Sequence, residues 1–272
     1  MKEPEAPANH EVVRTRGGAL AMRSLDAGEV MHPGVGPLVE AEQLYVRQSR
    51  LAERLLTSST LVLFDVGLGA GSNALAARAA SERAPAGAGR LQLVSFERDL
   101  GALRLALETP AAFGIDAEAA DAARALLAHG RHDTPRTTWR LEPGDVREAM
   151  DRVAERADVV YWDPFSPRAN PTLWTIAAFA AIRRAAGPRC TLFTYSASTA
   201  TRVALLLAGW AVGVGDAIGD KAHTTAAAAE PADLARPLER AWLTRLGRAD
   251  APLPADAPAD AAARAAAAPQ FR

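Results

Sequence analysis

The 272-residue chain contains very little cysteine and very little lysine. Cys190 stands alone, which excludes a disulfide within the chain and suits a reducing cytosol. Lys2 and Lys221 are the only lysines, so arginine carries nearly all of the positive charge. The formal net charge is −1, so the protein lacks the overall basic field that marks many nucleic-acid-binding proteins.

Long apolar stretches are also missing. No uninterrupted apolar run approaches the roughly 20 residues that a membrane-spanning helix needs, and residues 1–7 lack the apolar core of a signal peptide. We therefore expect a cytoplasmic protein with no membrane partner, and nothing in the sequence indicates an oligomeric state. His129 and His132 lie close together, but no cysteine or carboxylate at a ligand spacing completes a set, so we expect no metal site.

The most informative stretch is an apolar run that leads into alternating glycines. Leu61 to Phe64 suits a strand buried on both faces, as in a parallel sheet. Asp65 follows it, and then come Gly67, Gly69 and Gly71 before an alanine-rich helical pattern. Glycine permits the sharp turn from strand to helix and lets a ligand lie against bare peptide groups. Open α/β sheets bind nucleosides at this position, and we expect Asp65 to accept hydrogen bonds from the ligand.

The glycine spacing indicates which nucleoside is bound. A dinucleotide fingerprint has the spacing G-x-G-x-x-G, and its third glycine would fall on Ser72. The observed order, Asp-x-Gly-x-Gly-x-Gly, resembles instead the first motif of class I methyltransferases, which bind S-adenosylmethionine. A glycine-rich turn that binds no ligand is the alternative interpretation.

Two further acidic residues follow predicted strands. A second strand over 91–96 ends in Glu97, where nucleoside-binding α/β folds place the carboxylate that holds the ribose hydroxyls. A third strand over 137–141 leads to Asp145, which is placed to hydrogen-bond the adenine amino group. Capping of a helix that begins at Val146 is an alternative role for Asp145, and the two roles are compatible.

A fourth strand, over 158–162, runs into a proline-rich loop, residues 163–171. This loop lies at the carboxyl end of a strand beside the glycine-rich stretch, so it faces any bound nucleoside. It resembles the Asp/Asn-Pro-Pro-aromatic loop of methyltransferases that act on amino nitrogens. Asp163 can accept a proton or hydrogen bond from an amine, and Phe165 offers an apolar face to a planar base. A proline-stiffened turn capped by Asp163 is the alternative.

The rest of the chain alternates between strand and helix patterns. Before the glycines we expect a hairpin around Gly17-Gly18, a loop over 28–37 and a helix over 39–56. After them the patterns predict helices at 72–83, within 99–129, at 171–184 and 198–208, and strands at 190–194, 210–214 and 224–228. The tail alternates alanine, proline and aspartate, which predicts disorder.

Three segments together resemble the methyltransferase domain of the MnmC family, tRNA-modifying proteins that methylate the aminomethyl group of a wobble-position thiouridine. The segments are residues 28–45, residues 65–73 with 95–97, and residues 163–175. The third is the most specific, because Asp-x-Phe-Ser-Pro followed by Asn-Pro and Trp-Thr is rare by chance. The resemblance runs from about residue 10 to residue 245.

The resemblance implies an α/β fold: a doubly wound, Rossmann-like class I S-adenosylmethionine-dependent methyltransferase with an N-terminal hairpin-plus-helix extension. The expected organisation is a disordered leader 1–10, the extension 11–57, the methyltransferase domain 58–246 and a disordered tail 247–272. The implied cofactor-binding residues are Asp65, Gly67, Gly69, Gly71, Asn73, Glu97 and Asp145. The implied catalytic residues are Asp163 and Phe165, and the implied substrate-binding residues are Met31, His32, Tyr45, Pro164 and Asn170.

The expected activity is methyl transfer to an amine nitrogen, with a modified wobble uridine of tRNA as substrate. Bifunctional members of the family carry a flavin-dependent oxidase domain, which these residues do not include, so no FAD is expected. Those members also have glycine where Pro164 stands. Methyl or aminopropyl transfer to a small-molecule or protein amine is an alternative, as is a non-catalytic binding protein that keeps the fold.

Overall fold

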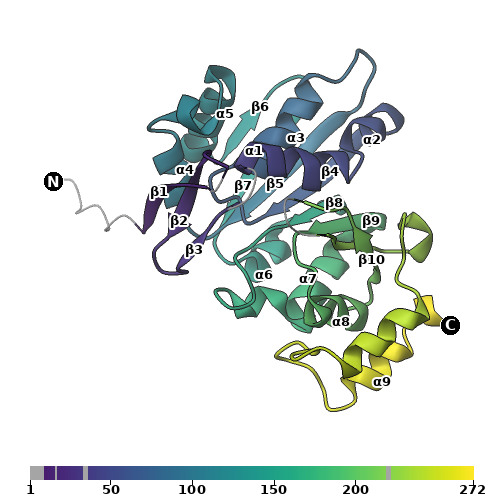
Figure 1. The fold of residues 1–272 in the computed structure, drawn as a ribbon. Coiled ribbons are helices and arrows are strands. Elements are labelled where there is room, and N and C mark those ends of the chain that lie inside the picture. Colours follow the sequence, from purple (N-terminus) through teal and green to yellow (C-terminus); the bar gives the residue numbers. More distant parts are fainter. Residues whose placement is uncertain (1–8, 16, 33–35, 219–221) are drawn as a thin grey trace.

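The computed structural model describes residues 9–15, 17–32, 36–218 and 222–272. An eight-stranded mixed sheet carries helices on both faces, and a three-stranded antiparallel sheet from the N-terminal region lies beside it (Figure 1). The fold is therefore the doubly wound α/β fold that the sequence predicts. Among these residues, no helix is both long and apolar enough to cross a membrane.

The centre of the large sheet is parallel. It consists of β4 (Thr60–Val66), β5 (Arg90–Glu97), β7 (Thr137–Pro143), β8 (Ala157–Trp162) and β9 (Ala186–Thr194). Three strands extend its edges: β6 (Arg131–Asp133), β10 (Ala211–Gly215) and β11 (Thr224–Ala228). The strand order is β10-β11-β9-β8-β4-β5-β7-β6. The chain thus builds outward from β4 through β5 to β7 and then returns to place β8 on the other side of β4. This reversal leaves a crevice at the carboxyl ends of β4 and β8.

The apolar run of β4 is continuous because both of its faces are buried. Leu61 and Leu63 belong to one apolar cluster, and Phe64 and Val66 belong to the other. The first cluster packs under α3 (Ser72–Glu82), α4 (Gly101–Ala106) and α5 (Ala117–His129). The second packs under α6 (Val146–Ala149), α7 (Ile176–Ala185) and α8 (Thr199–Leu207). Short 3-10 segments occupy Pro110–Phe113, Met150–Arg152, Pro171–Trp174, Pro231–Asp233, Arg240–Gly247 and Pro269–Phe271.

The N-terminal extension confirms the predicted hairpin, with β1 (His10–Arg14) paired to β2 (Leu20–Ser24). A two-residue strand, β3 (Glu29–Val30), joins it within the predicted loop. Asn9 and His10 lie in the expected disordered leader, yet the Asn9 amide donates to Asp99 and His10 is buried, so the leader prediction is wrong at these two residues. Residues 1–8 lie outside the described residues.

The helix predicted over 39–56 is not continuous. It consists of α1 (Pro37–Glu40), a π-helix (Ala41–Arg47) and α2 (Leu51–Thr57), separated at Arg50, whose φ is 54°. The physical reason is tertiary: the wider turn brings Tyr45 against Tyr161 of β8, with ring centroids 5.0 Å apart. The Ser49 hydroxyl also lies 3.0 Å from the Tyr161 hydroxyl. Apolar periodicity alone cannot show such a contact.

The C-terminal tail is ordered, so the prediction of disorder over 247–272 is wrong. It forms α9 (Ala261–Ala266), which packs against α8. Ala261 and Ala265 are buried one helical turn apart, so alanines that looked like low complexity form an apolar face. The Gln270 side chain accepts from the Val212 amide and donates to the Val212 and Leu238 carbonyls, which satisfies the backbone of edge strand β10.

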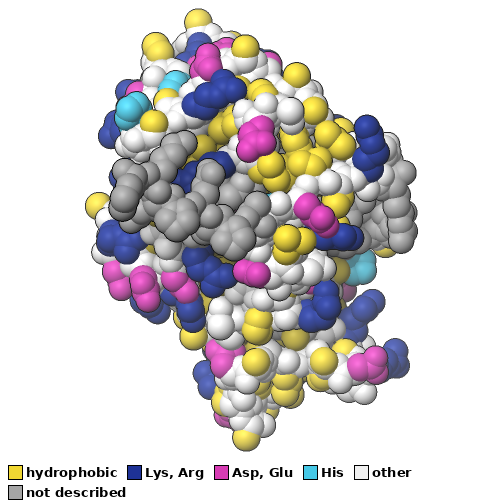
Figure 2. All heavy atoms as spheres, turned by 90° about the vertical axis from the view of Figure 1, so that its left-hand side faces the viewer, with side chains coloured by type: hydrophobic (Ala, Val, Ile, Leu, Met, Phe, Trp, Pro, Cys, Tyr) yellow, Lys and Arg dark blue, Asp and Glu magenta, His cyan; other side chains and the backbone are white. Residues whose placement is uncertain are grey.

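Charges of both signs are interspersed on the face that the N-terminal sheet contributes to. Figure 2 shows arginine side chains beside carboxylates over this face, rather than one continuous basic patch. This distribution agrees with the formal net charge of −1.

Candidate active site

A cavity of about 640 Å³ opens at the carboxyl ends of the central strands. Its walls come from the loops after β4, β5, β7 and β8 and from the N-terminal sheet with the residues after it. The predicted site residues that line it are Met31, His32, Gly67, Gly69, Glu97, Asp145, Asp163, Pro164, Phe165 and Asn170. The volume lies in the range of about 300–1,000 Å³ that is usual for small-molecule sites.

Four predicted site residues lie outside this lining: Tyr45, Asp65, Gly71 and Asn73. The Asp65 side chain is fully buried behind the wall and accepts a hydrogen bond from the Ser95 hydroxyl over 2.8 Å. Ser95 in turn accepts from the Trp139 indole over 3.0 Å. Burial raises the pKa of Asp65 to about 7, more than the Ser95 hydrogen bond lowers it. Asp65 therefore supports the wall, whereas the sequence-based prediction has it contact the ligand.

The glycine loop brings bare backbone to the cavity. Gly67 has a φ of +89°, and a Cβ atom there would lie 2.7 Å from the Asp163 carbonyl oxygen. Gly69 has a φ of +53°, and a Cβ there would lie 3.1 Å from the Met31 sulfur. Glycine is thus required at Gly67 both by the backbone conformation and by the close approach of the β8 loop. The same packing brings Met31 directly over the glycine loop.

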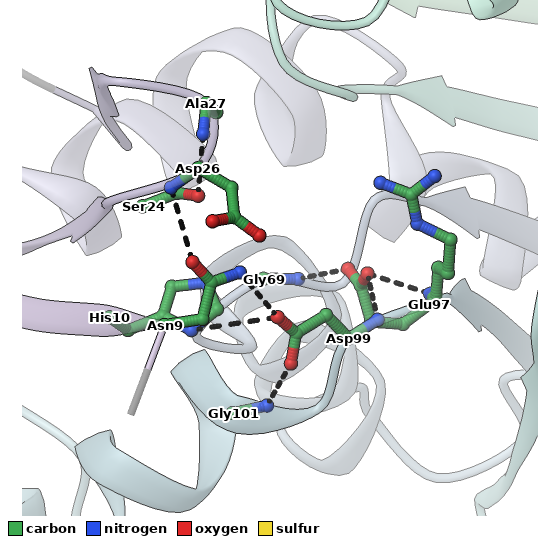
Figure 3. Close-up of polar contacts among 10 residues, drawn as sticks. Asn9, His10, Ser24, Asp26, Ala27, Gly69, Glu97, Asp99 and Gly101 are labelled. Atoms are coloured by element: carbon green, nitrogen blue, oxygen red, sulfur yellow. Dashed lines mark hydrogen bonds and ion pairs between the residues drawn. The ribbon is translucent and has the colours of Figure 1, made fainter. Parts of the chain in front are cut away.

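Glu97 is held rigidly beside this loop. One of its carboxylate oxygens accepts from the Gly69 amide over 2.9 Å, and the other accepts from the Arg98 and Asp99 amides over 2.7 and 2.9 Å (Figure 3). Burial raises the pKa of Glu97, although these three backbone hydrogen bonds oppose that rise. The structure thus joins the ends of β4 and β5 through one carboxylate at the cavity wall.

Asp145 makes the capping contact that the sequence allows. Its side chain accepts from the Arg147 amide over 2.9 Å, at the start of α6, and pairs with the Arg147 guanidinium. These hydrogen bonds hold the pKa of Asp145 below its usual range. Because Asp145 also lines the cavity, the cap leaves its predicted contact with adenine possible in geometry.

Asp163 lies at the centre of the polar cluster. Its carboxylate accepts from the Asn73 side-chain amide over 2.7 Å, and the His32 Nε2 atom lies 3.6 Å from the same oxygen. Burial raises the pKa of Asp163, while His32, the Tyr45 hydroxyl and Asn73 act in the opposite direction. Asn73 and Tyr45 thus reach the site from behind the wall, through Asp163.

His32 lies between two carboxylates. Its Nδ1 atom is 3.8 Å from Glu40 and its Nε2 atom is 3.6 Å from Asp163. Burial lowers the pKa of His32, but the two carboxylates outweigh burial, so its pKa is raised. The sequence-based prediction does not include Glu40 among the site residues. The position of Glu40 in the sequence could have indicated that it faces the interior, because it precedes the buried Leu44 by one helical turn.

The loop that carries Phe165 is held at several points. The Phe165 carbonyl accepts from the Trp174 indole over 2.7 Å, and the Pro164 carbonyl accepts from the Tyr195 hydroxyl over 3.0 Å. Glu29 of β3 accepts from both the amide and the hydroxyl of Ser166. The N-terminal sheet is therefore joined directly to the loop of β8, and Glu29 is a second residue that the sequence-based prediction omits.

No group of three or more His, Cys, Asp or Glu side chains in the described part of the chain is arranged to hold a metal ion.

Comparison with known proteins agrees with this geometry. Residues 122–230 match a family described as S-adenosyl-L-methionine-dependent methyltransferases. The chain is 34% identical over 194 residues to the tRNA 5-methylaminomethyl-2-thiouridine biosynthesis bifunctional protein MnmC of Burkholderia thailandensis, covering 68% of this chain and 30% of that protein. It is 32% identical over 232 residues to the MnmC protein of Ralstonia nicotianae, covering 83% of this chain and 34% of the relative.

These matches identify the chain as an S-adenosyl-L-methionine-dependent methyltransferase that resembles the MnmC proteins. It spans about 30% of the length of the curated relatives above. The fold agrees as well: the crystal structure of MnmC2 from Aquifex aeolicus superimposes with a TM-score of 0.75 at 24% identity, over 97% of this chain and 84% of that one. The resemblance to the MnmC family that residues 28–45, 65–73 and 163–175 indicate is thus confirmed.

The cavity of this MnmC-like methyltransferase fits its family's cofactor. Gly67 and Gly69 line the cavity and present backbone without a side chain to a ligand there. The Glu97 carboxylate is fixed next to that backbone by three amides. An adenosyl group has hydroxyls for such a carboxylate and a flat apolar face for bare peptide groups.

Proposed function

We propose that this protein methylates an amine nitrogen, and that the amine is the aminomethyl group of a modified wobble uridine in tRNA. The observation that carries the proposal is the position of Asp163, whose side chain is only 10% exposed, on the cavity wall of a methyltransferase fold. The MnmC proteins that resemble the chain are named for the biosynthesis of a methylaminomethyl uridine in tRNA. Their name supports the choice of substrate.

The charge of the cavity supports a cationic substrate. Its described lining holds one arginine, Arg98, against these carboxylates: Asp26, Glu29, Glu40, Glu97, Asp99, Asp145 and Asp163. A primary alkylamine is protonated at neutral pH, and S-adenosylmethionine carries a positive sulfonium. An acidic, partly enclosed cavity favours both cations, because attraction is stronger where water is excluded.

The cofactor-binding residues divide into two groups. Glu97 would hold the ribose hydroxyls, Asp145 the adenine amino group, and the backbone at Gly67 and Gly69 the flank of the nucleoside. The residues behind the wall would support these contacts: Asp65, Gly71 and Asn73. When bound, S-adenosylmethionine supplies an electrophilic methyl group, and its carbon–sulfur bond breaks with the electron pair remaining on sulfur.

On the substrate side, the chain must free a lone pair on nitrogen. A protonated amine has none, so Asp163 would take a proton from it and then hold the neutral amine toward the methyl group. Phe165 would lie against the uracil ring. The neighbouring lining residues would position the rest of the nucleoside: Met31, His32, Pro164 and Asn170. Tyr45 would act from behind, through Asp163.

Transfer of label from S-adenosylmethionine to tRNA tests this proposal. The tRNA is prepared from a strain that lacks this protein, and the labelled nucleoside is identified after digestion. We expect label in one wobble-position nucleoside with the wild type and much less with Asp163→Ala and Asp163→Asn. The surface variant Asp133→Asn, on edge strand β6, serves as the matched control and should keep wild-type activity.

Two results would contradict the proposal. Label found in protein or small molecules but not in tRNA would refute the substrate, and full activity of both Asp163 variants would refute the role of that carboxylate. Calorimetry with S-adenosylmethionine checks the cofactor separately, because cofactor binding does not require the acceptor.

A further inference from the structure

Three ionisable side chains from three separate segments lie in a row at the edge of the cavity. Glu40 ends α1, His32 follows β3 and Asp163 follows β8. The His32 ring spans the gap between the carboxylates, with Nδ1 3.8 Å from Glu40 and Nε2 3.6 Å from Asp163. Their side chains are only 11%, 13% and 10% exposed. The row of carboxylate, imidazole and carboxylate thus runs from the end of α1 to the proposed amine site.

We propose that His32 is the final acceptor of the proton that leaves the substrate amine, and that Glu40 is the positioning residue that orients His32. This inference rests on the proposed function, because only an amine that arrives protonated needs such an acceptor. It goes beyond that function by giving the proton a route and by assigning a role to Glu40.

The proposed route uses the tautomer of His32 that carries its proton on Nδ1. With Nδ1 toward the Glu40 carboxylate, the neutral ring places its N–H on that side and its lone pair on Nε2, which faces Asp163. A carboxylate at one ring nitrogen makes the other nitrogen a stronger base. The separations of 3.6 and 3.8 Å are longer than hydrogen bonds, as is usual for acid–base groups before substrate binds.

The proton transfer balances without any further reactant. The ammonium N–H bond breaks, its electron pair stays on nitrogen, and the proton passes to Asp163 and from there to His32 Nε2. The freed pair forms the new nitrogen–carbon bond. The imidazolium that results lies between two carboxylates, which stabilise its charge. His32 lines the cavity, so the proton leaves to solvent from this side.

The groups that face His32 favour its charged form. Glu40 from α1 and Asp163 from the β8 loop are nearest, and Asp65 at the end of β4 adds a weaker attraction. The hydroxyls of Tyr45 and Tyr195 also lie near the two carboxylates. Burial raises the pKa of both tyrosines. Neither hydroxyl competes as a base at neutral pH. Of the side chains named here, His32 is the one that becomes a cation when it takes up a proton.

The first experiment measures the ionisation of His32 directly. Proton–carbon NMR of histidine-labelled protein without substrate gives the titration of its five histidines, and the His32 signal is assigned by its absence in His32→Gly. We expect a pKa for His32 above the ordinary 6.5, lowered in Glu40→Gln and in Asp163→Asn and unchanged in Asp133→Asn. A His32 titration that is the same in the wild type and Glu40→Gln would overturn the proposal.

The second experiment measures methyl transfer to tRNA against pH. His32→Gly suits this test, because glycine accepts the positive φ of 50° at this position, so the variant should fold. We expect a rate about 100-fold lower, with partial rescue by added imidazole. In Glu40→Gln the acidic limb of kcat/KM should move to lower pH and the plateau should fall. A purely structural role for His32 gives neither the rescue nor the shifted limb.

The two experiments separate this proposal from the proposed function. If wild-type protein transfers no label to tRNA, the substrate assignment fails, and the NMR titration still decides whether Glu40 and Asp163 govern His32. If tRNA is methylated but His32→Gly keeps its full rate without imidazole at every pH, His32 is not the acceptor while the proposed function stands.

Discussion

Replacing Asp65 by asparagine should change how the stability of the protein depends on pH. The side chain is fully buried, and its pKa is raised to about 7, chiefly by burial. An aspartate in the unfolded chain has a pKa of about 3.9. As pH rises above that value, the unfolded state releases the proton first, so the folded state loses stability until pH passes the folded-state pKa.

The structure sets the size of this loss. A difference of about three pKa units corresponds to about 4 kcal/mol of unfolding free energy, present below about pH 4 and lost by about pH 7. Asparagine cannot ionise, yet its carbonyl can still accept the Ser95 hydroxyl. Its amide group would replace the Asp65 Oδ1 atom, which has no hydrogen-bond partner, at a cost of about 1–3 kcal/mol that does not vary with pH.

Urea unfolding of the wild type and Asp65→Asn between pH 4 and pH 8 checks this expectation. Relative to the wild type, Asp65→Asn should gain about 4 kcal/mol of unfolding free energy across that range. Other groups contribute equally to both proteins and cancel in the difference. The exposed Asp133, whose pKa is lowered by Arg131, gives the control: Asp133→Asn should show no such gain above pH 5. Parallel curves for Asp65→Asn and the wild type would refute the reasoning, because they would mean that Asp65 is ionised in the folded protein.

Three further predictions concern the glycine loop, the cofactor wall and the tail. Gly67→Ala should destabilise the protein by about 2 kcal/mol or more and weaken cofactor binding in calorimetry, because it adds a clash with the Asp163 carbonyl to the strain of positive φ. Gly87→Ala is the control, because Gly87 has a similar φ of +87° but open space around it. This variant should lower the unfolding free energy by only about 1 kcal/mol in thermal unfolding. Glu97→Gln should weaken S-adenosylmethionine binding about 10- to 100-fold, since a charged partner for the ribose is lost, and unchanged calorimetric affinity would count against the ribose contact. Gln270→Ala should lower the unfolding free energy by about 1–3 kcal/mol, because it leaves the Val212 amide of edge strand β10 without its hydrogen-bond partner, while methyl transfer per folded molecule stays unchanged.

Much of the fold followed from local pattern. The apolar run 61–64 predicts a doubly buried parallel strand, and β4 is one, with alternate side chains in separate apolar clusters. The spacing of Gly67, Gly69 and Gly71 predicts a strand-to-helix turn, and all three have positive φ. Glu97 ends its strand as predicted. In each case the pattern that indicates the structure lies within a few neighbouring residues, so it can be recognised from sequence order alone.

What sequence reasoning missed depends on contacts between distant segments. The break at Arg50 reflects packing of Tyr45 and Ser49 on Tyr161, which lies more than 100 residues away. The tail is ordered because Gln270 meets the backbone of Val212, 58 positions earlier. In both contacts, the sequence around one residue gives no indication of the distant residue that it meets.

The candidate site likewise has features that the sequence predicts and features that depend on contacts between distant segments. The sequence by itself determined that a bare-backbone loop, the carboxylate of Glu97 and the carboxylate of Asp163 would meet at one edge of a parallel sheet, because strand ends of a doubly wound fold converge there. Only the tertiary structure decided that Asp65 lies behind the wall and that Glu40 and His32 stand in line with Asp163. Burial and charge pairing are properties of the packed chain, and they set the pKa of a carboxyl or an imidazole more strongly than its neighbours in sequence do.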